Sequence, residues 1–393
     1  MERIGIFGGS FNPPHIGHIR AAQAAVRALQ LNKLLLMPVN QPPHKTAAAG
    51  SPSAQQRLQM LHIATHTDPA LEVSDLEISR GGVSYTWETV AQVRSAYPQA
   101  QIYLLMGSDM FLTFQNWKNP EKILEQALLA VFCRGHKDER AKIAAKKAEL
   151  EALGHSVQVI DHPCVDISST QIRRLLAFRC AEEFLPAGVG EYIQANGLYN
   201  TQTDWKNLPM PELEKVVVSL LKPNRVNHVL GCRDTAVELA RRWGVDETDA
   251  ARAGILHDIT KALDGALQLT LCREYGKILS DFSRRYPKTL HALTGSLVAE
   301  RIFGENRAVV DAIESHTTGK AAMNMLEKII YVADYMEPNR DFPGVERLRE
   351  YAFSDMDAAL KLGLEMTLEH LKRQGAEVSP ESREALEYLG AKV

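Results

Sequence analysis

The stretch RIGIFGGSFNPPHIGH, residues 3–18, decides the fold of the first half of this chain. Its apolar residues Ile4–Phe7 predict a buried strand, two glycines then turn the chain, and a helix is expected over His18–Leu29. Glycine allows backbone N–H groups to approach phosphate closely, and the first turn of a helix adds positive potential. The stretch therefore predicts a phosphate-binding turn after the first strand of a nucleotide-binding sheet.

Further apolar runs alternate with helical segments through residues 1–199. Buried strands are expected at Leu34–Pro38, Gln101–Met106, Leu128–Cys133 and Val157–Ile160, and a helix is expected over Ser53–His66. Strands this apolar, separated by helices, indicate a parallel sheet that is covered on both faces. We therefore expect an α/β, doubly wound, Rossmann-like domain over residues 1–199.

The pattern changes after Tyr199. Residues 200–210 are polar and include Pro209, which is typical of a linker. Residues 211–393 show helical period and no strand signal, so we expect an all-α domain there. Its expected helices are Glu212–Leu221, Asn227–Trp243, Asp246–His257, His291–Phe303, Ala308–Ser315, Met325–Tyr335 and Phe353–Arg373.

Composition limits the class of protein. The 393 residues carry 45 Lys and Arg against 48 Asp and Glu, a formal net charge of −3, and neither half is strongly basic, so no nucleic-acid partner is expected. Five scattered cysteines form no CxxC pair, which favours a reducing compartment. There is no apolar run of about 20 residues and no signal-peptide pattern, so a cytoplasmic protein without a membrane span is expected. A homo-oligomer is among the expected forms.

Two histidines and four later segments define the first candidate site. His15 and His18 stand three residues apart, so both can face one ligand where the helix starts. Nucleotidyl transfer mainly requires positioning and charge stabilisation at phosphorus. The later segments are PPHK (42–45), GVSYTWET (82–89), GSD (107–109) ahead of Trp117, and ISSTQIR (167–173). With these segments, residues 1–199 resemble the bacterial nicotinate-nucleotide adenylyltransferases of the HxGH nucleotidylyltransferase superfamily.

This resemblance implies transfer of AMP from ATP to nicotinate mononucleotide, which gives nicotinate adenine dinucleotide and pyrophosphate, with Mg²⁺ on the β- and γ-phosphates. It implies catalytic roles for His15, His18 and Arg173. It implies ATP contacts from Gly8, Gly9, Ser10, Phe11, Asp109, Ile167, Ser168 and Ser169. It implies mononucleotide contacts from His44, Lys45, Tyr85, Thr86, Thr89 and Trp117.

Without the resemblance, several of these residues also have structural interpretations. Asp109 can serve as a helix N-cap, and Ser168, Ser169 and Thr170 form a good N-cap cluster for a helix that starts near Gln171. Trp117 can belong to the core, and His44 and Lys45 can be surface charges.

The second half holds a set of histidines and aspartates beside apolar helical runs. They are His228, the pair His257-Asp258, His291, His316 and Asp334. Buried charge is costly unless it is paired or bound to metal, so a convergence of these residues in a helical domain indicates a metal site. Ligation by His and carboxylate without thiolate suits iron, manganese or another borderline-to-hard ion. For any single histidine, a core or surface role is the alternative.

The segments HA (291–292), HTTG (316–319) and ADYMEPNR (333–340) resemble the HD-domain bis(5′-nucleosyl)-tetraphosphatases that cleave symmetrically. The resemblance implies iron or another divalent or trivalent transition metal on His228, His257, Asp258 and Asp334. His291 and His316 would hold a second metal or contact phosphates, and Arg340 is a candidate phosphate clamp. The implied reaction converts diadenosine tetraphosphate to two ADP. Two alternatives stay open: a broader nucleotide phosphatase or phosphodiesterase, and a non-catalytic nucleotide sensor.

Overall fold

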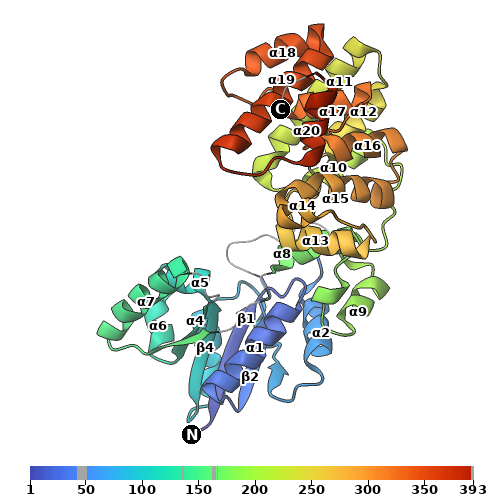
Figure 1. Ribbon diagram of the computed structural model, residues 1–393. Coiled ribbons are helices and arrows are strands. Elements are labelled where there is room, and N and C mark those ends of the chain that lie inside the picture. Colours follow the sequence, from blue (N-terminus) through green and yellow to red (C-terminus); the bar gives the residue numbers. More distant parts are fainter. Residues whose placement is uncertain (42–50, 134–136, 162–164, 166, 391–393) are drawn as a thin grey trace. The chain divides into compact units, whose positions relative to one another are not determined.

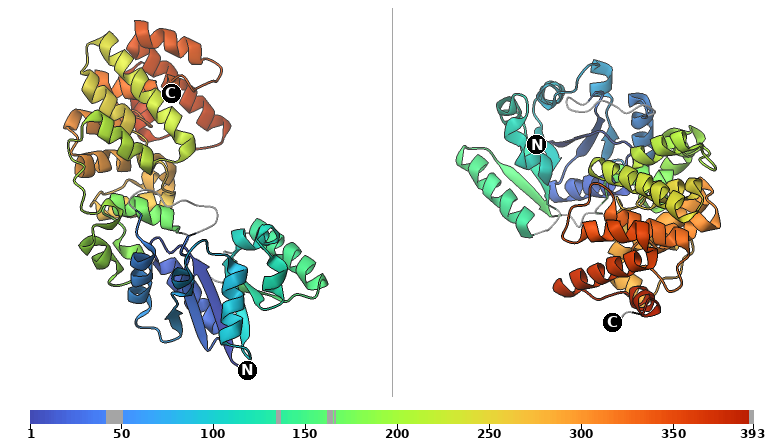
Figure 2. Two further views of the ribbon diagram at one scale, coloured as in Figure 1. Left: turned by 180° about the vertical axis from the view of Figure 1, so that it is seen from behind. Right: turned by 90° about the horizontal axis from the view of Figure 1, so that it is seen from above.

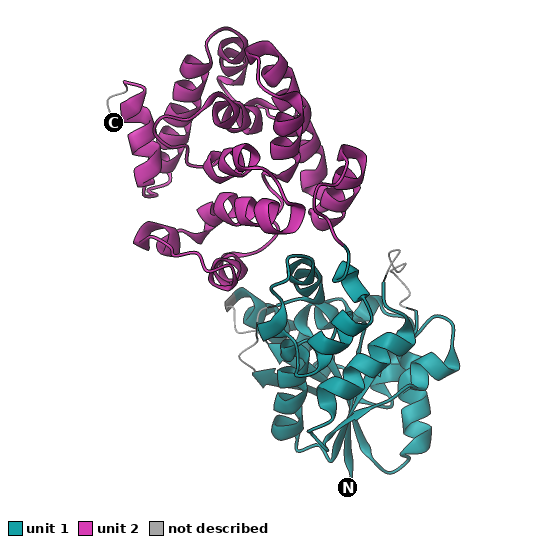
Figure 3. Ribbon diagram, turned by 90° about the vertical axis from the view of Figure 1, so that its right-hand side faces the viewer, with its two compact units in different colours: residues 1–203 teal, residues 204–393 magenta. Residues whose placement is uncertain are grey.

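The computed structural model describes residues 1–41, 51–133, 137–161, 165 and 167–390. The chain forms two compact units, Met1–Thr203 and Asp204–Val393, which are coloured separately in Figure 3.

A six-stranded parallel sheet forms the centre of the first unit (Figure 1). Its spatial order is β3-β2-β1-β4-β5-β6, and every neighbouring pair is parallel. The strands are β1 (Arg3–Gly9), β2 (Lys33–Pro38), β3 (Leu71–Val73), β4 (Gln101–Gly107), β5 (Leu128–Cys133) and β6 (Val157–Asp161). This order confirms the doubly wound, Rossmann-like sheet. The three-residue strand β3 was not predicted, since it is too short to show a pattern.

Helices cover both faces of this sheet. On one face, α1 (Ile16–Leu29) and α2 (Ala54–Thr65) contribute buried alanines and leucines to a core with the side chains of β1 to β6 that point that way. On the other face, the core includes residues of α4 (Thr86–Ala96), α5 (Ser108–Leu112), α6 (Pro120–Leu124) and α7 (Lys137–Ala152). The remaining α-helices of the unit are α3 (Leu76–Arg80), α8 (Ser169–Ala177) and α9 (Val189–Ala195).

The crevice for a ligand lies where the strand order reverses, between β1 and β4. In an open α/β sheet the crossovers leave such a point in opposite directions, and ligands bind beyond the carboxyl ends of the strands there. Gly8 is the next-to-last residue of β1 and Gly107 is the last residue of β4, and a Cβ built on either glycine would meet no atom within 4 Å. The sheet therefore leaves open the place to which the phosphate-binding turn belongs.

The second unit is helical, and no strand occurs in the part of it that the structure describes (Figure 2). No helix among the described residues is long and apolar enough to cross a membrane. The α-helices of the second unit are α10 (Met210–Leu220), α11 (Val226–Trp243), α12 (Glu247–Leu256), α13 (Gly265–Glu274), α14 (Asp281–Arg285), α15 (Leu290–Val298), α16 (Arg307–Ser315), α17 (Met325–Met336), α18 (Val345–Ser354), α19 (Met356–Arg373) and α20 (Pro380–Tyr388).

One expected helix was wrong at its start. The segment predicted to begin at Phe353 is divided at Asp355, whose extended backbone ends α18 and whose carboxylate accepts a hydrogen bond from the backbone N–H of Ala358 at 3.0 Å. A carboxylate in this N-cap position satisfies a free N–H group of the new helix, so α19 begins at Met356. The expected helix His291–Phe303 is also modified, because it continues from α15 into a π-helical turn over Ala299–Phe303.

Close contact between α11 and α12 depends on a glycine. A Cβ on Gly254 would lie 2.8 Å from Cα of Arg233, which is backbone and cannot swing away. Gly254→Ala should therefore destabilise the second unit by roughly 1–3 kcal/mol through forced separation of the helices. Intrinsic helix propensity alone would give the opposite sign, a gain of about 1 kcal/mol. The midpoint of urea unfolding, followed by circular dichroism, distinguishes the two: a lower midpoint is expected, and an equal or higher one would contradict close packing.

Candidate active sites

The first site is built on the turn between β1 and α1. His15 is the N-cap residue of α1, and its backbone N–H donates to Nδ1 of His18 at 3.2 Å. Since a backbone N–H can only donate, Nδ1 of His18 is the acceptor and Nε2 carries the hydrogen. His18 is thus prepared as a neutral hydrogen-bond donor, which suits a phosphate oxygen.

The two rings lie close together, with centroids 3.7 Å apart, and Gly17 makes this possible. A Cβ at residue 17 would lie 3.0 Å from Nδ1 of His15. Burial lowers the pKa of His15 to about 4. Burial and the neighbouring His15 hold the pKa of His18 well below its ordinary value. Both imidazoles are therefore neutral at pH 7 in the free protein.

The turn itself is held by two arginines and a tyrosine. Arg57 on α2 donates to the backbone oxygens of Ser10 at 2.8 Å and Val39 at 2.6 Å. Arg173 on α8 donates to the backbone oxygen of Asn12 at 2.7 Å, and the hydroxyl of Tyr199 donates to the side-chain oxygen of Asn12 at 2.7 Å. These contacts fix the path of the backbone from which ligand contacts are expected. Arg57 and Tyr199 were not among the residues that the sequence singled out.

The segment predicted from the ISSTQIR motif lies against the same turn. Ser168 is the N-cap of α8, so the helix begins at Ser169, two residues before the expected start. The hydroxyl of Ser169 donates to the backbone oxygen of Pro13 at 3.1 Å. The structure thus brings the N-terminus of α8, with Ser168, Ser169 and Arg173, to the turn that His15 closes. Ile167, half-buried, precedes this cap.

Of the predicted ATP contacts Phe11 and Asp109, the first is buried and the second is exposed. The Phe11 side chain is only 1% exposed and its ring lies 5.0 Å from that of His18, so it supports the histidine from the core. Asp109 is exposed in the first turn of α5, whose N-cap is Gly107, so the N-cap interpretation of Asp109 is wrong. Its carboxylate is available at the carboxyl end of β4.

A cavity of about 180 Å³ lies beside the two strand ends. Thr86, Thr89 and Trp117 line it together with Gly8 and Gly9, so the structure brings these predicted residues together. Thr89 is buried and its hydroxyl donates to Glu77 at 2.6 Å, which gives it a structural role as well. Tyr85 does not line the cavity, and its ring packs under Nζ of Lys118 at 4.0 Å. His44 and Lys45 lie outside the described residues.

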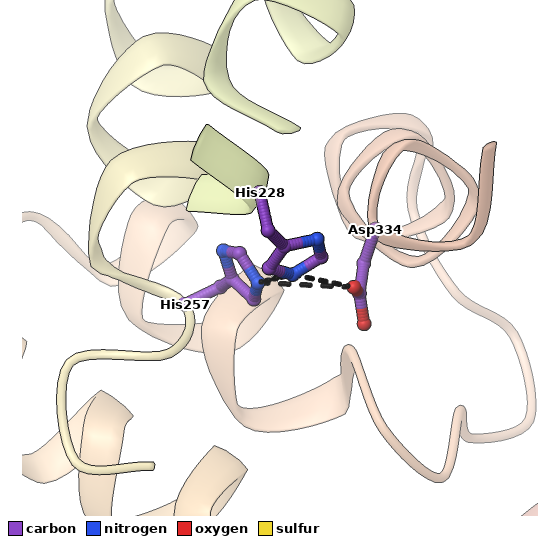
Figure 4. Close-up of side chains that lie close together, drawn as sticks. All are labelled: His228, His257 and Asp334. Atoms are coloured by element: carbon purple, nitrogen blue, oxygen red, sulfur yellow. Dashed lines mark hydrogen bonds and ion pairs between the residues drawn. The ribbon is translucent and has the colours of Figure 1, made fainter. Parts of the chain in front are cut away.

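The second site lies among the helices of the second unit. His228 comes from the first turn of α11, His257 and Asp258 follow the end of α12, and Asp334 lies on α17. Figure 4 shows His228, His257 and Asp334 pointing toward one another. Nε2 of His228 lies 3.3 Å from Nε2 of His257 and 3.1 Å from Oδ1 of Asp334. Oδ2 of Asp258 lies 3.7 Å from Nε2 of both histidines.

These distances fit a metal ion. Bonds of about 2.0–2.2 Å from imidazole nitrogen and carboxylate oxygen place neighbouring ligand atoms about 3–3.5 Å apart. In the group His228, His257 and Asp334 two of the three distances lie in this range, and Nε2 of His257 lies 3.9 Å from Oδ1 of Asp334. His257, Asp258 and His316 form a second group that shares His257. The Oδ1 atom of Asp258 lies 3.5 Å from Nε2 of His291 and 3.8 Å from Nε2 of His316. Asp258 thus presents one oxygen to each side.

All four imidazoles are oriented in the same way. Nδ1 of His257 contacts the backbone oxygen of Gly254 at 2.7 Å, and Nδ1 of His316 that of Ile313 at 2.7 Å. Nδ1 of His291 contacts the backbone oxygen of Lys288 at 2.9 Å, and Nδ1 of His228 contacts the carboxylate oxygen Oε1 of Glu337 at 3.1 Å. An oxygen acceptor fixes the hydrogen on Nδ1 and leaves the Nε2 lone pair for a ligand, as metal-binding histidines require.

Burial and charge shift the titration of these groups. Burial is the main cause that lowers the pKa of His257, His291 and His316, the last to about 4. Burial alone would raise the pKa of Asp334, but the contact with His228 and the nearby His257, His316 and Arg340 bring this pKa well below its ordinary value. Neutral imidazoles and an ionised carboxylate are the protonation states that bind metal.

Three basic side chains, and the acid Glu337 described above, lie next to the metal-ligand cluster. Arg340 donates to Oδ1 of Asp334 at 2.7 Å, Arg225 contacts Asp258, and Nζ of Lys261 lies 2.7 Å from Nε2 of His291. Sequence reasoning named Arg340 but missed Arg225, Lys261 and Glu337. Glu337 contacts His228 and Lys261 contacts His291, which lie far from them in the sequence, so no local pattern indicated these two residues.

Two family models match separate parts of the chain. Residues 6–175 match the family model described as cytidylyltransferase-like, and residues 225–339 match the HD domain model. A probable nicotinate-nucleotide adenylyltransferase of Neisseria meningitidis is 37% identical over 205 residues, 51% of this chain and 99% of that protein. A protein of the same name from Gemmatimonas aurantiaca is 38% identical over 198 residues, 50% of this chain and 92% of its own length.

Two solved structures are similar to parts of the chain. A crystal structure of an HD superfamily hydrolase from Clostridium acetobutylicum is 37% identical, covers 46% of this chain and 97% of its own, and has a TM-score of 0.45. A nicotinic acid mononucleotide adenylyltransferase from Plasmodium falciparum is 18% identical, covers 51% of this chain and 98% of its own, and has a TM-score of 0.42.

Acid should destabilise the first unit through His15. Its pKa is about 4 in the folded chain and about 6.5 when unfolded, so the unfolded chain binds more protons between these values. The contribution of His15 to the free energy of unfolding is therefore fully present above pH 6.5 and is lost as the pH falls toward 4. From pH 7 to pH 5 the contribution of His15 is about 2 kcal/mol. Urea unfolding at both values should show a smaller pH difference for His15→Gln than for wild type. The exposed control His62→Gln should behave as wild type, and equal behaviour of all three would contradict a buried neutral His15.

Glu337 should strengthen metal binding through His228. Glu337→Gln removes the charge that orients and polarises this imidazole, and such changes lower metal affinity about tenfold or more. Titration of metal-depleted protein with Mn²⁺ or Fe²⁺ measures the affinity. Glu346→Gln on α18, where the acid is exposed, is the control and should bind as wild type. Equal affinity of the two variants would show that Glu337 does not support a metal ligand.

Proposed function

Because this chain belongs to the nicotinate-nucleotide adenylyltransferase family and carries a helical HD domain after that part, we propose that it is a bifunctional nucleotide enzyme. Residues 1–199 transfer AMP from ATP to nicotinate mononucleotide, and residues 211–393 hydrolyse diadenosine tetraphosphate to two ADP. Residues 200–210 join the two parts. The observation that carries the proposal is the pair of separate sites, a phosphate-binding turn at His15 and His18 and a metal-ligand cluster at Asp258.

In the first reaction the 5′-phosphate of the mononucleotide attacks the α-phosphorus of ATP in line, and pyrophosphate leaves. His18 donates Nε2–H to a phosphate oxygen, and its low pKa supports a donor role without a proton transfer. The triphosphate lies against the N-termini of α1 and α8, where free N–H groups and Arg173 counter its charge. Mg²⁺ neutralises the β- and γ-phosphates.

The pyridine ring is proposed to occupy the 180 Å³ cavity. Trp117 offers a half-buried aromatic face there, and Thr86 offers a hydroxyl from the first turn of α4. Tyr85, Thr89, His44 and Lys45 remain predicted mononucleotide contacts. Of these, Thr89 would act through Glu77 and the loop before α4, since its own hydroxyl already donates to that carboxylate.

In the second reaction His228, His257, Asp258 and Asp334 would hold one metal ion, and Asp258 with His291 and His316 would hold a second. A transition metal such as iron supplies a water nucleophile near neutral pH and polarises the phosphate. The chain itself orients the imidazoles, and Arg340 and Arg225 counter charge on the phosphate chain. A broader nucleotide phosphatase uses the same cluster, and a sensor would not need this complete a set of oriented ligands.

Chromatographic analysis of products tests both halves of the proposal. The full chain with ATP and nicotinate mononucleotide should give nicotinate adenine dinucleotide, and nicotinamide mononucleotide should react less. With Mn²⁺ or Fe²⁺ and diadenosine tetraphosphate it should give ADP alone. AMP and ATP as products would show that the cleavage is asymmetrical and would contradict the proposed reaction. Hydrolysis of many nucleotides at equal rates would favour the broader phosphatase.

The two activities should separate by mutation. His18→Ala removes the neutral donor and should lower adenylyl transfer by about 10²-fold or more, because such a donor stabilises the charge that develops on phosphate. It should leave hydrolysis of diadenosine tetraphosphate as in wild type. Asp258→Ala should do the reverse and lower the bound metal. If either change silenced both activities in a folded protein, two independent sites would be the wrong account.

A further inference from the structure

A second cavity adjoins the metal-ligand cluster, because Asp334 and Arg340 are among its lining residues. It measures about 590 Å³. Phe342 and Pro343 form part of its wall after α17, and Met366, Glu369, His370 and Arg373 line it from α19. Pockets of about 300–1,000 Å³ hold small organic ligands, so the cavity has room for more than a phosphate group.

Its wall near the cluster is aromatic and held in place. The rings of Tyr335 and Phe342 meet edge to face, with centroids 5.5 Å apart at 83°. Tyr335 also stacks on Tyr331 at 6.2 Å, and its hydroxyl accepts a hydrogen bond from Thr367 at 3.1 Å. Both cavity rings are only half-buried. A fixed, accessible aromatic wall is a suitable surface for a flat heterocyclic base.

The opposite side of the cavity is polar. His370 and Arg373 are three residues apart on α19 and so share one face of the helix. Arg373 is exposed, and no hydrogen bond or ion pair of its side chain occurs among the described residues. An arginine without a partner can bind phosphate in a bidentate manner. Glu369 provides an acceptor for an amino group.

We propose that this cavity binds the nucleoside and first phosphate of the substrate of the HD cluster. The base lies against Tyr335 and Phe342, Arg373 contacts phosphate, and the phosphate chain runs past Arg340 to the metal-ligand cluster. This inference rests on the proposed hydrolytic function. The residues of α19 lie beyond 225–339, the part that matches the HD domain model, so the chain adds its nucleoside recognition outside the general metal-binding framework.

The test compares a nucleotide substrate with a small one on the metal-loaded full chain. Diadenosine tetraphosphate carries nucleosides, whereas bis(p-nitrophenyl) phosphate offers only the phosphodiester. Arg373→Ala should lower the ratio of kcat/KM for diadenosine tetraphosphate to kcat/KM for bis(p-nitrophenyl) phosphate about tenfold. This is the effect expected from the loss of one hydrogen bond to a charged group. Phe342→Ala should lower the same ratio. Lys372→Ala is the matched control, because Lys372 is an exposed cation on α19 outside the cavity, and it should keep the wild-type ratio.

The inhibition constant of ADP against hydrolysis of the small ester provides a second measurement. Arg373→Ala should raise it about tenfold, and Lys372→Ala should not. Equal ratios and equal inhibition constants for the two variants would overturn the inference. Wild-type protein that hydrolyses the small ester but is not inhibited by ADP would also overturn it, while leaving metal-dependent hydrolysis in place. Wild-type protein that hydrolyses neither substrate would overturn the proposed function itself.

Discussion

The buried carboxylate of Asp258 is the constraint on which the second unit depends. It is 1% exposed, and its two oxygens face different imidazoles, His228 and His257 on one side and His291 and His316 on the other. A buried charge needs counter-charge, and neutral histidines do not provide it. Arg225 and Lys261 supply part of it from the chain, and metal ions on both sides would supply the rest. His228 in α11, His257 after α12, His291 in α15 and His316 after α16 each bring an imidazole to this carboxylate.

The first unit is arranged differently, because backbone groups and two neutral histidines face the expected phosphate site. A polyanionic substrate requires many donors, and the turn between β1 and α1 presents them where two helix N-termini meet. Arg57, Arg173 and Tyr199 hold that turn, and Gly17 lets His15 and His18 lie ring to ring. The chemistry here is positioning, since both histidines are neutral at physiological pH. The first site thus offers neutral donors, whereas the second groups buried imidazoles around carboxylates.

The sequence predicted most of this arrangement where the signal was local. Apolar runs predicted five of the strands, and the Gly8–His18 segment predicted the turn that joins the first strand to the first helix. Motifs also named the histidines and aspartates that the structure brings together in the second unit, because each of them adjoins an apolar helical run. The strand β3 was missed because its three residues are too few to show a pattern. The boundary between α18 and α19 was missed because the N-cap at Asp355 interrupts a continuous helical pattern. Arg57, Glu337 and Lys261 were missed because their roles arise from contacts between segments distant in sequence.

Anomalous X-ray diffraction from crystals of the protein prepared with Fe²⁺ or Mn²⁺ tests the central claim most directly. The account predicts two peaks on either side of Asp258, about 3.5–4 Å apart, one bound by His228, His257 and Asp334 and the other by His291 and His316. A single peak on the first side would reduce the cluster to one metal. Peaks elsewhere, or Asp258 bound to protein groups alone in metal-saturated crystals, would contradict the account.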